Sequence, residues 1–338
     1  MEIMSGGKTE RLEGWGGIAR AAEILRGGGT VAFPTETVYG LGANALDASA
    51  VARIFEAKQR PAWDPVIAHV FDRGMVDRVA EVFQDAERLM AAFWPGPLTL
   101  LLPRKPEVPD AVTADRPLVG VRMPRHELAL ELIRAAGGPV AAPSANRFGR
   151  TSPTTAAHVL EDLDGRIDAV LDGGPTLVGV ESTVIGPAEE GAGWMLYRPG
   201  GVSVEALEEV LGVGMVSMFQ PVERAGAPAS LPSPGVGIRH YAPRARLVLV
   251  GQGELADAVA GGGAKVGVML PEGWVSAGAA FVYRWGVWGD GEELASRLFA
   301  GLRELDEVGA EVIVCPVPEM GGIGEAIRDR LGKAARDK

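Results

Sequence analysis

The sequence predicts an α/β protein with two domains of unequal size. Short runs of β-branched and aromatic residues alternate with longer segments whose apolar residues recur at helical spacing. A Pro- and Gly-rich stretch over residues 215–245 interrupts this alternation. The chain has 338 residues, a length that usually folds as about two domains. We therefore expect a larger domain over residues 1–214, a linker over 215–245 and a smaller domain over 246–338.

The larger domain is expected to contain a mixed sheet. Its predicted helices cover residues 18–26, 49–58, 75–93, 127–136, 154–163 and 204–211. Its predicted strands cover residues 30–33, 66–71, 98–102, 118–122, 140–142, 169–171, 183–185 and 195–198. This interleaving favours a twisted mixed sheet whose faces are covered by flanking helices.

The smaller domain repeats the alternation of strands and helices. Its predicted strands cover residues 247–250, 265–269, 281–283 and 312–315, and its predicted helices cover residues 255–260, 292–305 and 323–331. This pattern is typical of a Rossmann-like α/β domain. The linker before it is longer than the ~12–15 residues of ordinary structureless loops, which favours a role at a site.

Composition and charge exclude several classes of protein. No run approaches the ~18 apolar residues of a membrane span, and the first residues lack the features of a signal peptide, so we expect a cytoplasmic protein without membrane contact. The single cysteine, Cys315, lies in the apolar run EVIVCPV, which favours a buried strand thiol. The four histidines are scattered, and no metal site is predicted. A net charge of −11 argues against nonspecific binding of nucleic acid.

Polar residues follow the predicted strand over 30–33 in the sequence FPTETVYGLG. In extended chain Thr35 and Thr37 would face the same way, toward a ligand beyond the strand end. Gly40 and Gly42 would let the backbone approach that ligand closely. A tight turn held by local side-chain hydrogen bonds is an equally good interpretation of this stretch alone.

Two cations follow the predicted helix over 49–58 in the sequence KQRPAWDP. Pro61 favours an extended Arg60, so Lys58 and Arg60 would point the same way and suit a phosphate or a carboxylate. Taken singly, each cation is more commonly a solvated surface charge. His69 lies in the predicted strand over 66–71, where a core histidine is the ordinary interpretation.

Hydroxyl and amide side chains follow the predicted strand over 140–142. Ser144 and Asn146 belong to the sequence APSAN. Ser152, before Pro153, is predicted to be the N-cap of the next helix. The N-terminus of that helix would suit a phosphate, although plain capping is the commoner case.

Ser182 and Arg198 complete the set of candidates. Ser182 belongs to the sequence ESTV, and Arg198 is held extended by Pro199. No nucleophile–base pair or carboxylate pair is evident from spacing. Hydroxyls, amides and fixed cations at strand ends are typical of a site that positions charged substrates and stabilises a transferring phosphate.

These motifs, in this order, resemble the YrdC-like family of threonylcarbamoyl-AMP synthases. The motifs are FPTETVYGLG, KQRP with His69 downstream, APSAN, SPTTAAHV, ESTVI and RPG. The sequence SPGVGIRHYAP and the segment after it resemble the long, two-domain form. The resemblance implies a nucleotidyltransferase that makes threonylcarbamoyl-AMP and pyrophosphate from L-threonine, bicarbonate and ATP with Mg²⁺. It also implies a functional link to the complex that transfers the threonylcarbamoyl group to tRNA, with contact to tRNA as a further expectation.

The resemblance assigns roles to residues through the matched motifs. Thr37, His69, Arg122 and Ser182, with Thr35 as a neighbour, resemble positions that contact L-threonine. Positions that hold the nucleotide and its phosphates match Lys58, Arg60, Asp64, Ser144, Asn146, Ser152 and Arg198. We expect Lys58 and Arg60 to act in catalysis as well. Tyr241, in the linker, resembles a residue that closes over the nucleotide, so the linker is expected to act as a lid that excludes water.

The chain departs from the family pattern at several positions. Val236, Gly237 and Ile238 stand where the family commonly has methionine, lysine and tyrosine, which removes a cation and an aromatic ring from the linker. Leu118 and Ala142 stand where threonine is frequent, and Asp64 where asparagine is usual.

Two other functions are compatible with parts of this pattern. A noncatalytic module that binds double-stranded RNA or tRNA is the first, although the net charge opposes it. The second is a carbamoyl-transfer domain of the hydrogenase-maturation type, which shares the fold. That domain normally occurs beside acylphosphatase and zinc-finger modules, and the complete linker motif also opposes this alternative.

Overall fold

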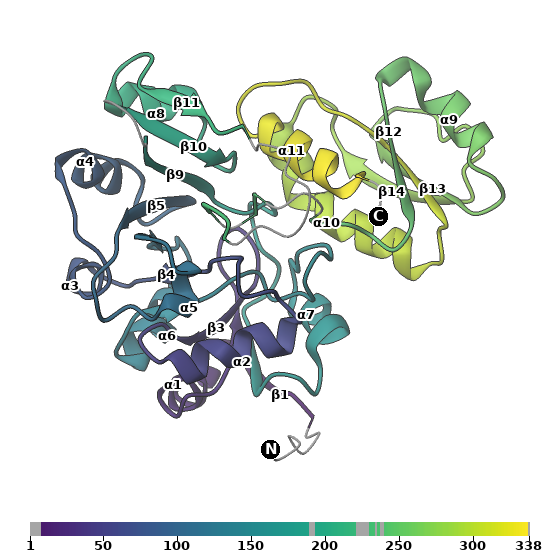
Figure 1. Cartoon of the computed structure of the whole chain (residues 1–338). Coiled ribbons are helices and arrows are strands. Elements are labelled where there is room, and N and C mark those ends of the chain that lie inside the picture. Colours follow the sequence, from purple (N-terminus) through teal and green to yellow (C-terminus); the bar gives the residue numbers. More distant parts are fainter. Residues whose placement is uncertain (1–7, 189–192, 221–229, 234, 237–239, 337–338) are drawn as a thin grey trace.

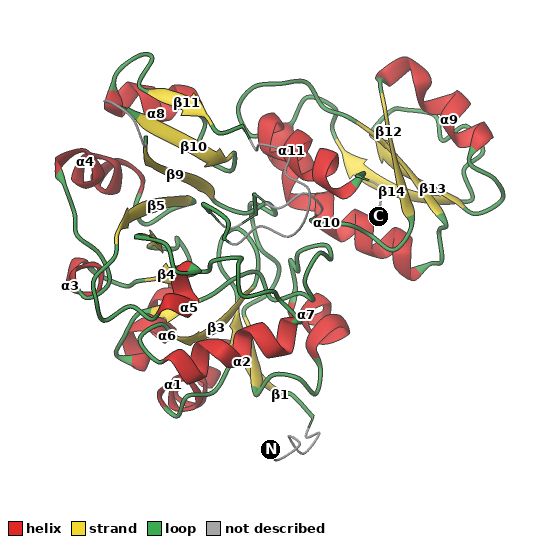
Figure 2. Ribbon diagram, in the orientation of Figure 1, coloured by secondary structure: helices red, strands yellow, loops and turns green. Residues whose placement is uncertain are grey.

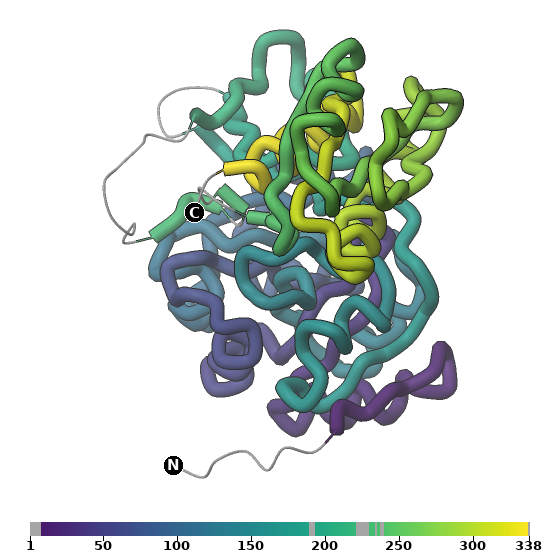
Figure 3. Tube along the Cα trace, turned by 90° about the vertical axis from the view of Figure 1, so that its right-hand side faces the viewer, coloured from purple at the N-terminus to yellow at the C-terminus, as the bar shows by residue number. Residues whose placement is uncertain are grey.

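The computed structural model describes residues 8–188, 193–220, 230–233, 235–236 and 240–336, which form two α/β domains (Figure 1). An 11-stranded sheet organises the first domain and a 4-stranded sheet the second. Figure 2 shows helices packed around both sheets, and Figure 3 shows the second domain seated on the first. The predicted fold class is confirmed. Within the described residues, no helix has both the length and the hydropathy needed to cross a membrane.

The large sheet is mixed, as predicted. In order of neighbours its strands are β1 (Glu10–Glu13), β8 (Ala169–Asp172), β2 (Val31–Phe33), β3 (Gly40–Asn44), β7 (Val140–Ala141), β4 (Ile67–His69), β6 (Leu118–Arg122), β5 (Leu98–Pro103), β9 (Thr183–Pro187), β10 (Trp194–Arg198) and β11 (Val216–Met218). Neighbours such as β4 and β6 are parallel, whereas β3 and β7, and β7 and β4, are antiparallel.

The helices of the first domain are short and amphipathic. They are α1 (Ile18–Arg26), α2 (Ala48–Lys58), α3 (Arg73–Asp77), α4 (Gln84–Phe93), α5 (Asp110–Thr113), α6 (Glu127–Ala136), α7 (Ala156–Leu163) and α8 (Val204–Leu211), with a 3₁₀ turn over Gly14–Gly17. Helix α2 begins where Asp47 accepts hydrogen bonds from the N–H groups of Ser49 and Ala50. It ends at Gln59, whose φ of 54° is left-handed. This end places Lys58 and Arg60.

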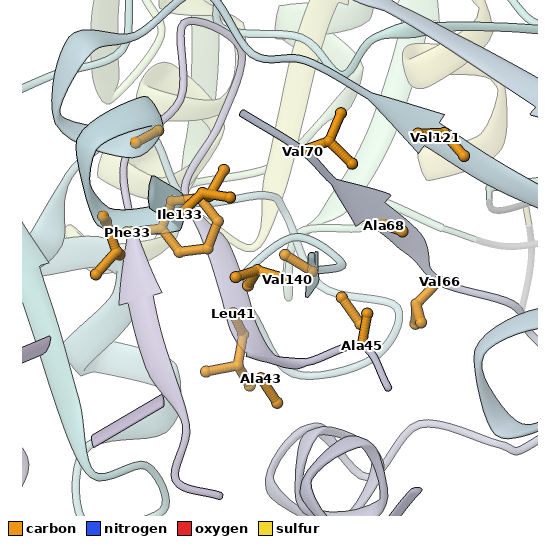
Figure 4. Close-up of a cluster of buried hydrophobic side chains, with 14 of the residues drawn as sticks. Phe33, Leu41, Ala43, Ala45, Val66, Ala68, Val70, Val121, Ile133 and Val140 are labelled. Carbon is orange, nitrogen blue, oxygen red and sulfur yellow. The ribbon is translucent and has the colours of Figure 1, made fainter. Parts of the chain in front are cut away.

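A buried hydrophobic cluster lies under the sheet and supports β2, β3 and β4 (Figure 4). Phe33 and Leu41 are fully buried in it, and burial of such a side chain stabilises the fold by roughly 1.5–3 kcal/mol. A Cβ atom at Gly42 would lie 2.7 Å from Phe33 and 2.8 Å from Val140, so β3 needs glycine there. The expectation that Gly42 approaches a ligand is therefore wrong, because Gly42 serves core packing.

The second domain is a parallel sheet, as the Rossmann-like alternation predicts. Its strands, in order of neighbours, are β12 (Arg246–Val250), β15 (Val312–Pro316), β13 (Val266–Pro271) and β14 (Phe281–Gly286). Its helices are α9 (Leu255–Gly261), α10 (Gly291–Glu307) and α11 (Gly324–Ala334), with a 3₁₀ turn over Gln252–Glu254. Cys315 is buried in β15, and burial raises the pKa of its thiol, as expected for a structural cysteine.

The predicted helix over residues 75–93 is two helices, α3 and α4. The residues between them pair with the chain that follows β5: the N–H of Glu81 donates to the oxygen of Pro103, and the N–H of Lys105 donates to the oxygen of Val79. These pairings replace helical hydrogen bonds, so the helix is interrupted where β-branched valines occur.

Other element boundaries also differ from the predictions. Helix α7 begins at Ala156 and its N-cap is Thr155, so the prediction that Ser152 caps this helix is wrong. Strands β1 and β3 were not predicted, because their short sequences ERLE and GLGAN lack β-branched residues. Residues 216–218, which the sequence analysis placed in the linker, pair with β10 as strand β11.

Candidate active site

Side chains from distant parts of the chain converge on one cavity in the first domain. The centre of a water molecule can occupy about 50 Å³ of it. Most of the predicted site residues line this cavity, namely Thr35, Thr37, Arg60, His69, Arg122, Ser144, Ser182, Arg198 and Tyr241. Lys58, Asp64, Asn146 and Ser152 do not line it, but they are buried beside it. The motifs therefore meet in space.

The cavity extends over more than one edge of the sheet. His69 and Arg122 lie opposite each other at the carboxyl ends of the parallel strands β4 and β6. Strand β7 is antiparallel to β4, and the N–H of Ala142 donates to the oxygen of Ile67 at 2.8 Å. Ser144 therefore enters the cavity from the opposite direction, which the rule for parallel sheets does not predict.

The turn over residues 35–38 is held by its own hydroxyls and also lines the cavity. The Thr35 hydroxyl donates to the oxygen of Val38 at 2.7 Å and lies 2.8 Å from the Thr37 hydroxyl. The N–H of Thr37 donates to Thr35 Oγ1 at 3.2 Å. The interpretation of this motif as a tight turn is thus confirmed, and the local bonds fix hydroxyls that line the cavity, while their contact with a ligand stays a prediction.

Arg122, which lines the cavity, forms a buried ion pair with Glu36. Nη2 of Arg122 lies 2.7 Å from Glu36 Oε2, and Nη1 donates to Thr37 Oγ1 at 3.0 Å. Burial opposes ionisation of Glu36, but the charge of Arg122 outweighs it and holds the pKa of Glu36 below its ordinary value. Arg122 is thereby a fixed cation beside a hydroxyl-lined turn.

His69 is a buried, neutral imidazole on the same wall. Burial, reinforced by the charge of Arg122, lowers the pKa of His69 to about 3. Its Nδ1 lies 3.3 Å from the oxygen of Ile67, and its ring meets the edge of Phe33 with centroids 6.1 Å apart. The side chain is both part of the core and exposed to the cavity, so it can form a hydrogen bond with a ligand without carrying charge.

Lys58 is buried and holds a loop. It is only 1% exposed, and its Nζ donates to the main-chain oxygens of Ser144, at 2.6 Å, and Asn146. Burial, together with the charge of Arg60, lowers the pKa of Lys58 well below its ordinary value. The interpretation of Lys58 as a solvated surface charge is therefore wrong. In the structure Lys58 fixes the loop that carries Ser144.

Arg60 is fixed by its own segment and reaches the cavity. Its Nη2 lies 3.0 Å from Asp64 Oδ1 and donates to the oxygen of Pro65 at 2.7 Å, while Nε donates to the oxygen of Asp64 at 3.1 Å. Lys58 ends a helix and Gln59 is left-handed, so the two cations do not share one extended segment as predicted. Asp64 neutralises part of the charge of Arg60.

Ser152, Glu181, Ser182 and Arg198 form a connected group. The Ser152 hydroxyl donates to Glu181 Oε1. Arg198 donates to Ser182 Oγ at 3.1 Å and to the oxygen of Ser182 at 3.0 Å. Ser182 Oγ is also 2.8 Å from the hydroxyl of Thr99. Arg198 and Ser182 thus occupy adjacent positions on the cavity wall, and the segment that leads into Ser182 is bonded to the turn over residues 35–38, since the N–H of Gly179 donates to the oxygen of Thr37 at 3.0 Å.

The linker contributes Gly235, His240 and Tyr241 to the cavity wall. Gly235 has a φ of 76°, and a Cβ atom there would lie 2.7 Å from the Tyr241 hydroxyl and 3.0 Å from Arg198 Nη1. Sites for drug-sized ligands measure roughly 300–1,000 Å³. The cavity, with about 50 Å³, is too small for a nucleotide while these residues lie in it. Gly237 and Ile238, two of the three positions that depart from the family linker, lie outside the described residues.

Two family models match the chain in succession. The model described as telomere recombination matches residues 23–200. The model described as threonylcarbamoyl-AMP synthase, C-terminal domain, matches residues 202–336. A threonylcarbamoyl-AMP synthase from Pyrococcus abyssi is 44% identical to this chain and covers 96% of it, with 96% of its own length matched. This chain belongs to the threonylcarbamoyl-AMP synthase family.

Other members of the family support the same assignment. A threonylcarbamoyl-AMP synthase from Bacillus subtilis is 44% identical over 94% of this chain and 92% of its own length. The crystal structure of P. abyssi Sua5 complexed with L-threonine superposes with a TM-score of 0.88 and 42% identity, over 97% of each chain. The family resemblance inferred from the order of the motifs is therefore confirmed, and it extends through both domains.

Several residues at the site of this family member were not predicted. Glu36 was overlooked although it lies inside the motif FPTETVYGLG, where a carboxylate in a buried stretch indicates a nearby cation. Glu181, in the motif ESTV, is paired with Arg330 of the second domain at 2.7 Å. The same rule indicates a cation for Glu181, but no local signal identifies Arg330, which lies 149 residues away in sequence.

Proposed function

We propose that the protein is an L-threonylcarbamoyladenylate synthase, which makes threonylcarbamoyl-AMP and pyrophosphate from L-threonine, bicarbonate and ATP. The observation that carries this proposal is the single cavity in which a hydroxyl-lined turn, a neutral His69 and three buried arginines meet. Such a cavity suits an amino acid on one side and phosphates on the other. The names of the relatives from P. abyssi and B. subtilis support it.

The two walls of the cavity suggest where each substrate binds. Arg122 offers its charge to the carboxylate of threonine, and Thr35 and Thr37 surround that position with hydroxyls. Arg60 and Arg198 lie with Ser144 on the remainder of the wall, where they would contact the phosphates of ATP. Ser182 lies between the two sets, bonded to Arg198.

The reaction requires no nucleophile from the protein. The neutral amine of threonine adds to CO₂ derived from bicarbonate and becomes a carbamate, and the proton lost from nitrogen combines with the hydroxide lost from bicarbonate to give water. A carbamate oxygen then attacks the α-phosphorus of ATP. The bond from that phosphorus to the bridging oxygen of pyrophosphate breaks, and pyrophosphate leaves with the electron pair. The arginines stabilise the charge on the phosphates, and the closed linker excludes water that would hydrolyse the mixed anhydride.

Magnesium is proposed to arrive with the nucleotide. Among the described residues, no group of three or more His, Cys, Asp or Glu side chains could hold a metal ion. Mg²⁺ commonly binds substrate phosphates and water with only one or two carboxylates from the protein, so the residues of the cavity fit an ion carried by ATP. Bound there, Mg²⁺ would neutralise phosphate charge.

The product defines the expected partners. Threonylcarbamoyl-AMP is an activated acyl donor, so it must be consumed by an enzyme that transfers the threonylcarbamoyl group to tRNA. We place both reactions in the cytoplasm. Direct contact with tRNA would require a local basic surface on a chain with a net charge of −11.

The test is to incubate purified protein with ATP, Mg²⁺, bicarbonate and L-threonine. Mass spectrometry should detect threonylcarbamoyl-AMP, and pyrophosphate release should require threonine. The matched control omits bicarbonate and scavenges CO₂, which should abolish the adduct but leave ATP binding intact. Binding of double-stranded RNA without threonine-dependent pyrophosphate would instead favour a noncatalytic RNA-binding module.

A further inference from the structure

The segment that carries Ser182 packs directly on the second domain. Val180 is fully buried in one hydrophobic cluster with Phe299 of α10. At Gly179, where φ is 77°, a Cβ atom would lie 2.4 Å from the oxygen of Ala295, so backbone touches backbone across the domain boundary. Helix α10 therefore supports the chain that leads into Ser182.

Arg330 of α11 extends this contact to Glu181. Its Nε donates to Glu181 Oε2 at 2.7 Å, and its Nη2 donates to the oxygen of Glu181 at 3.3 Å. The other carboxylate oxygen of Glu181 accepts the hydroxyl of Ser152. Arg330 is 1% exposed, although it is a charged residue of a different domain. Figure 1 shows α11 on the side of the second domain that faces the first.

The same helix holds the linker. The Arg330 guanidinium carbon lies 5.1 Å from the centroid of the Tyr241 ring, and that ring stacks on Phe299 at 5.7 Å. Lys333 Nζ donates to the oxygen of Gly235 at 2.7 Å. Both linker residues that line the cavity beside Arg198 are thus fixed by the second domain.

We propose that Arg330 is a positioning residue for the nucleotide half of the active site, acting through Glu181 and Tyr241. This inference rests on the function proposed above. Ser152 and Tyr241 are predicted nucleotide contacts: Arg330 lies directly against the Tyr241 ring, and Glu181 connects it to Ser152 through two hydrogen bonds. Three of the predicted threonine contacts, Thr35, Thr37 and Arg122, are instead bonded to one another, whereas a fourth, Ser182, directly follows Glu181 in the chain. Loss of Arg330 should therefore affect ATP more than threonine.

The test compares single variants on α11. Arg330→Met should raise both the Kd and the KM for ATP about 10- to 100-fold, the change expected when a displaced nucleotide site loses one charge-assisted hydrogen bond to ATP, and change the KM for threonine less than about threefold. Arg330→Lys keeps the charge without the planar fork, so it should recover only part of the affinity. The matched control is Arg328→Met, because Arg328 bonds Pro318 within its own domain and should leave the Kd for ATP unchanged.

A double variant separates positioning from stability. Arg330→Met removes the cation paired with the buried Glu181, while Asp329 keeps its second partner Lys333, so the variant is also expected to destabilise the fold. Glu181→Gln/Arg330→Met removes both charges. If Arg330 positions the nucleotide site, the double variant should regain the melting temperature and keep the raised Kd for ATP. A return of both quantities to wild-type values would overturn the inference.

The two proposals fail in different ways. If the wild-type protein forms no threonylcarbamoyl-AMP, the proposed function is wrong, and the Kd for ATP measured by calorimetry still decides the role of Arg330. If the wild-type protein forms the adduct and Arg330→Met binds ATP as tightly as the wild type, only the inference about Arg330 is wrong.

Discussion

The guanidinium of Arg122 lies 2.7 Å from the carboxylate of Glu36, and their side chains are 4% and 2% exposed. A buried pair of this kind is stable only while both charges are present, because removal of one partner leaves the other without solvent or counter-ion. Arg122 also donates to Thr37, in the turn that lines the cavity. The pair therefore links the stability of the fold to the charge balance of the cavity wall.

Glu36→Gln should lower the free energy of unfolding by about 3 kcal/mol, since it leaves Arg122 buried and unpaired. The carboxylate of threonine can replace the lost charge, so threonine should raise the melting temperature more in this variant than in the wild type. Thermal unfolding with and without threonine measures both effects. An equal or smaller shift in the variant would show that threonine does not bind at Arg122.

Lys58→Ala should lower the free energy of unfolding by roughly 2–3 kcal/mol, because two buried main-chain oxygens lose their donor. The notion that Lys58 is an exposed cation whose loss spares the fold is contradicted by its burial. Urea denaturation measures the change. Lys265→Ala, which removes a 59%-exposed partner of Glu311, is the control and should stay within about 0.5 kcal/mol of the wild type.

The residues that line the cavity, and Lys58 beside it, show how far the sequence predicts the site. The order of the motifs indicates that Thr37, Ser144, Ser182 and Arg198 meet, and the cavity brings them together. The direction of Lys58 depends on the left-handed Gln59 and on the burial of the helix end, neither of which is encoded by alternation. Periodicity predicts whether an element is apolar on one face, but it does not predict which side chains form hydrogen bonds with the backbone of distant segments.

The strands of the fold likewise divide into those that their own composition predicts and those that it does not. The strands over β4, β5 and β6 are rich in aliphatic residues and were predicted, whereas GLGAN in β3 has the composition of a turn. Gly42 is explained by Phe33 and Val140, which pack on it from other strands. The sequence gives the least information about the contact between Glu181 and Arg330, since the two residues belong to different domains.

Acid should destabilise the protein through its histidines. Burial lowers the pKa of His69 to about 3 and that of His158 to about 4, with the charges of Arg122 and Arg303, respectively, contributing. The unfolded chain takes up protons below a pKa of about 6.5 while the folded protein does not, so this stability is complete above about pH 6.5 and is lost as the pH falls toward 4.

His158→Gln provides the matched measurement of this effect. When the pH is lowered from about 7.5 to about 5.5, the free energy of unfolding should fall by about 1 kcal/mol less in the variant than in the wild type. The reason is that the unfolded variant takes up one proton fewer than the unfolded wild type. Urea denaturation at both pH values gives the difference. Identical losses would mean that the pKa of His158 is the same in the folded and the unfolded chain.

Cutting the chain after Pro232 should lower the turnover of the enzyme and raise the rate at which threonylcarbamoyl-AMP is hydrolysed. The linker residues Gly235 and Tyr241 close the cavity to about 50 Å³, and a free end at residue 233 would let them leave it. Arg303 of α10 is paired with Glu161 and Asp162 of the first domain, so the two domains of the cut form should remain folded and associated. A protease site inserted after Pro232 allows intact and cut protein to be compared in one preparation, with circular dichroism as the check on folding.

Unchanged turnover and adduct lifetime after complete cutting would contradict the role of the linker as a lid. A cut protein that binds ATP faster but turns over more slowly would instead separate the two functions of the closed linker, admission of the nucleotide and exclusion of water.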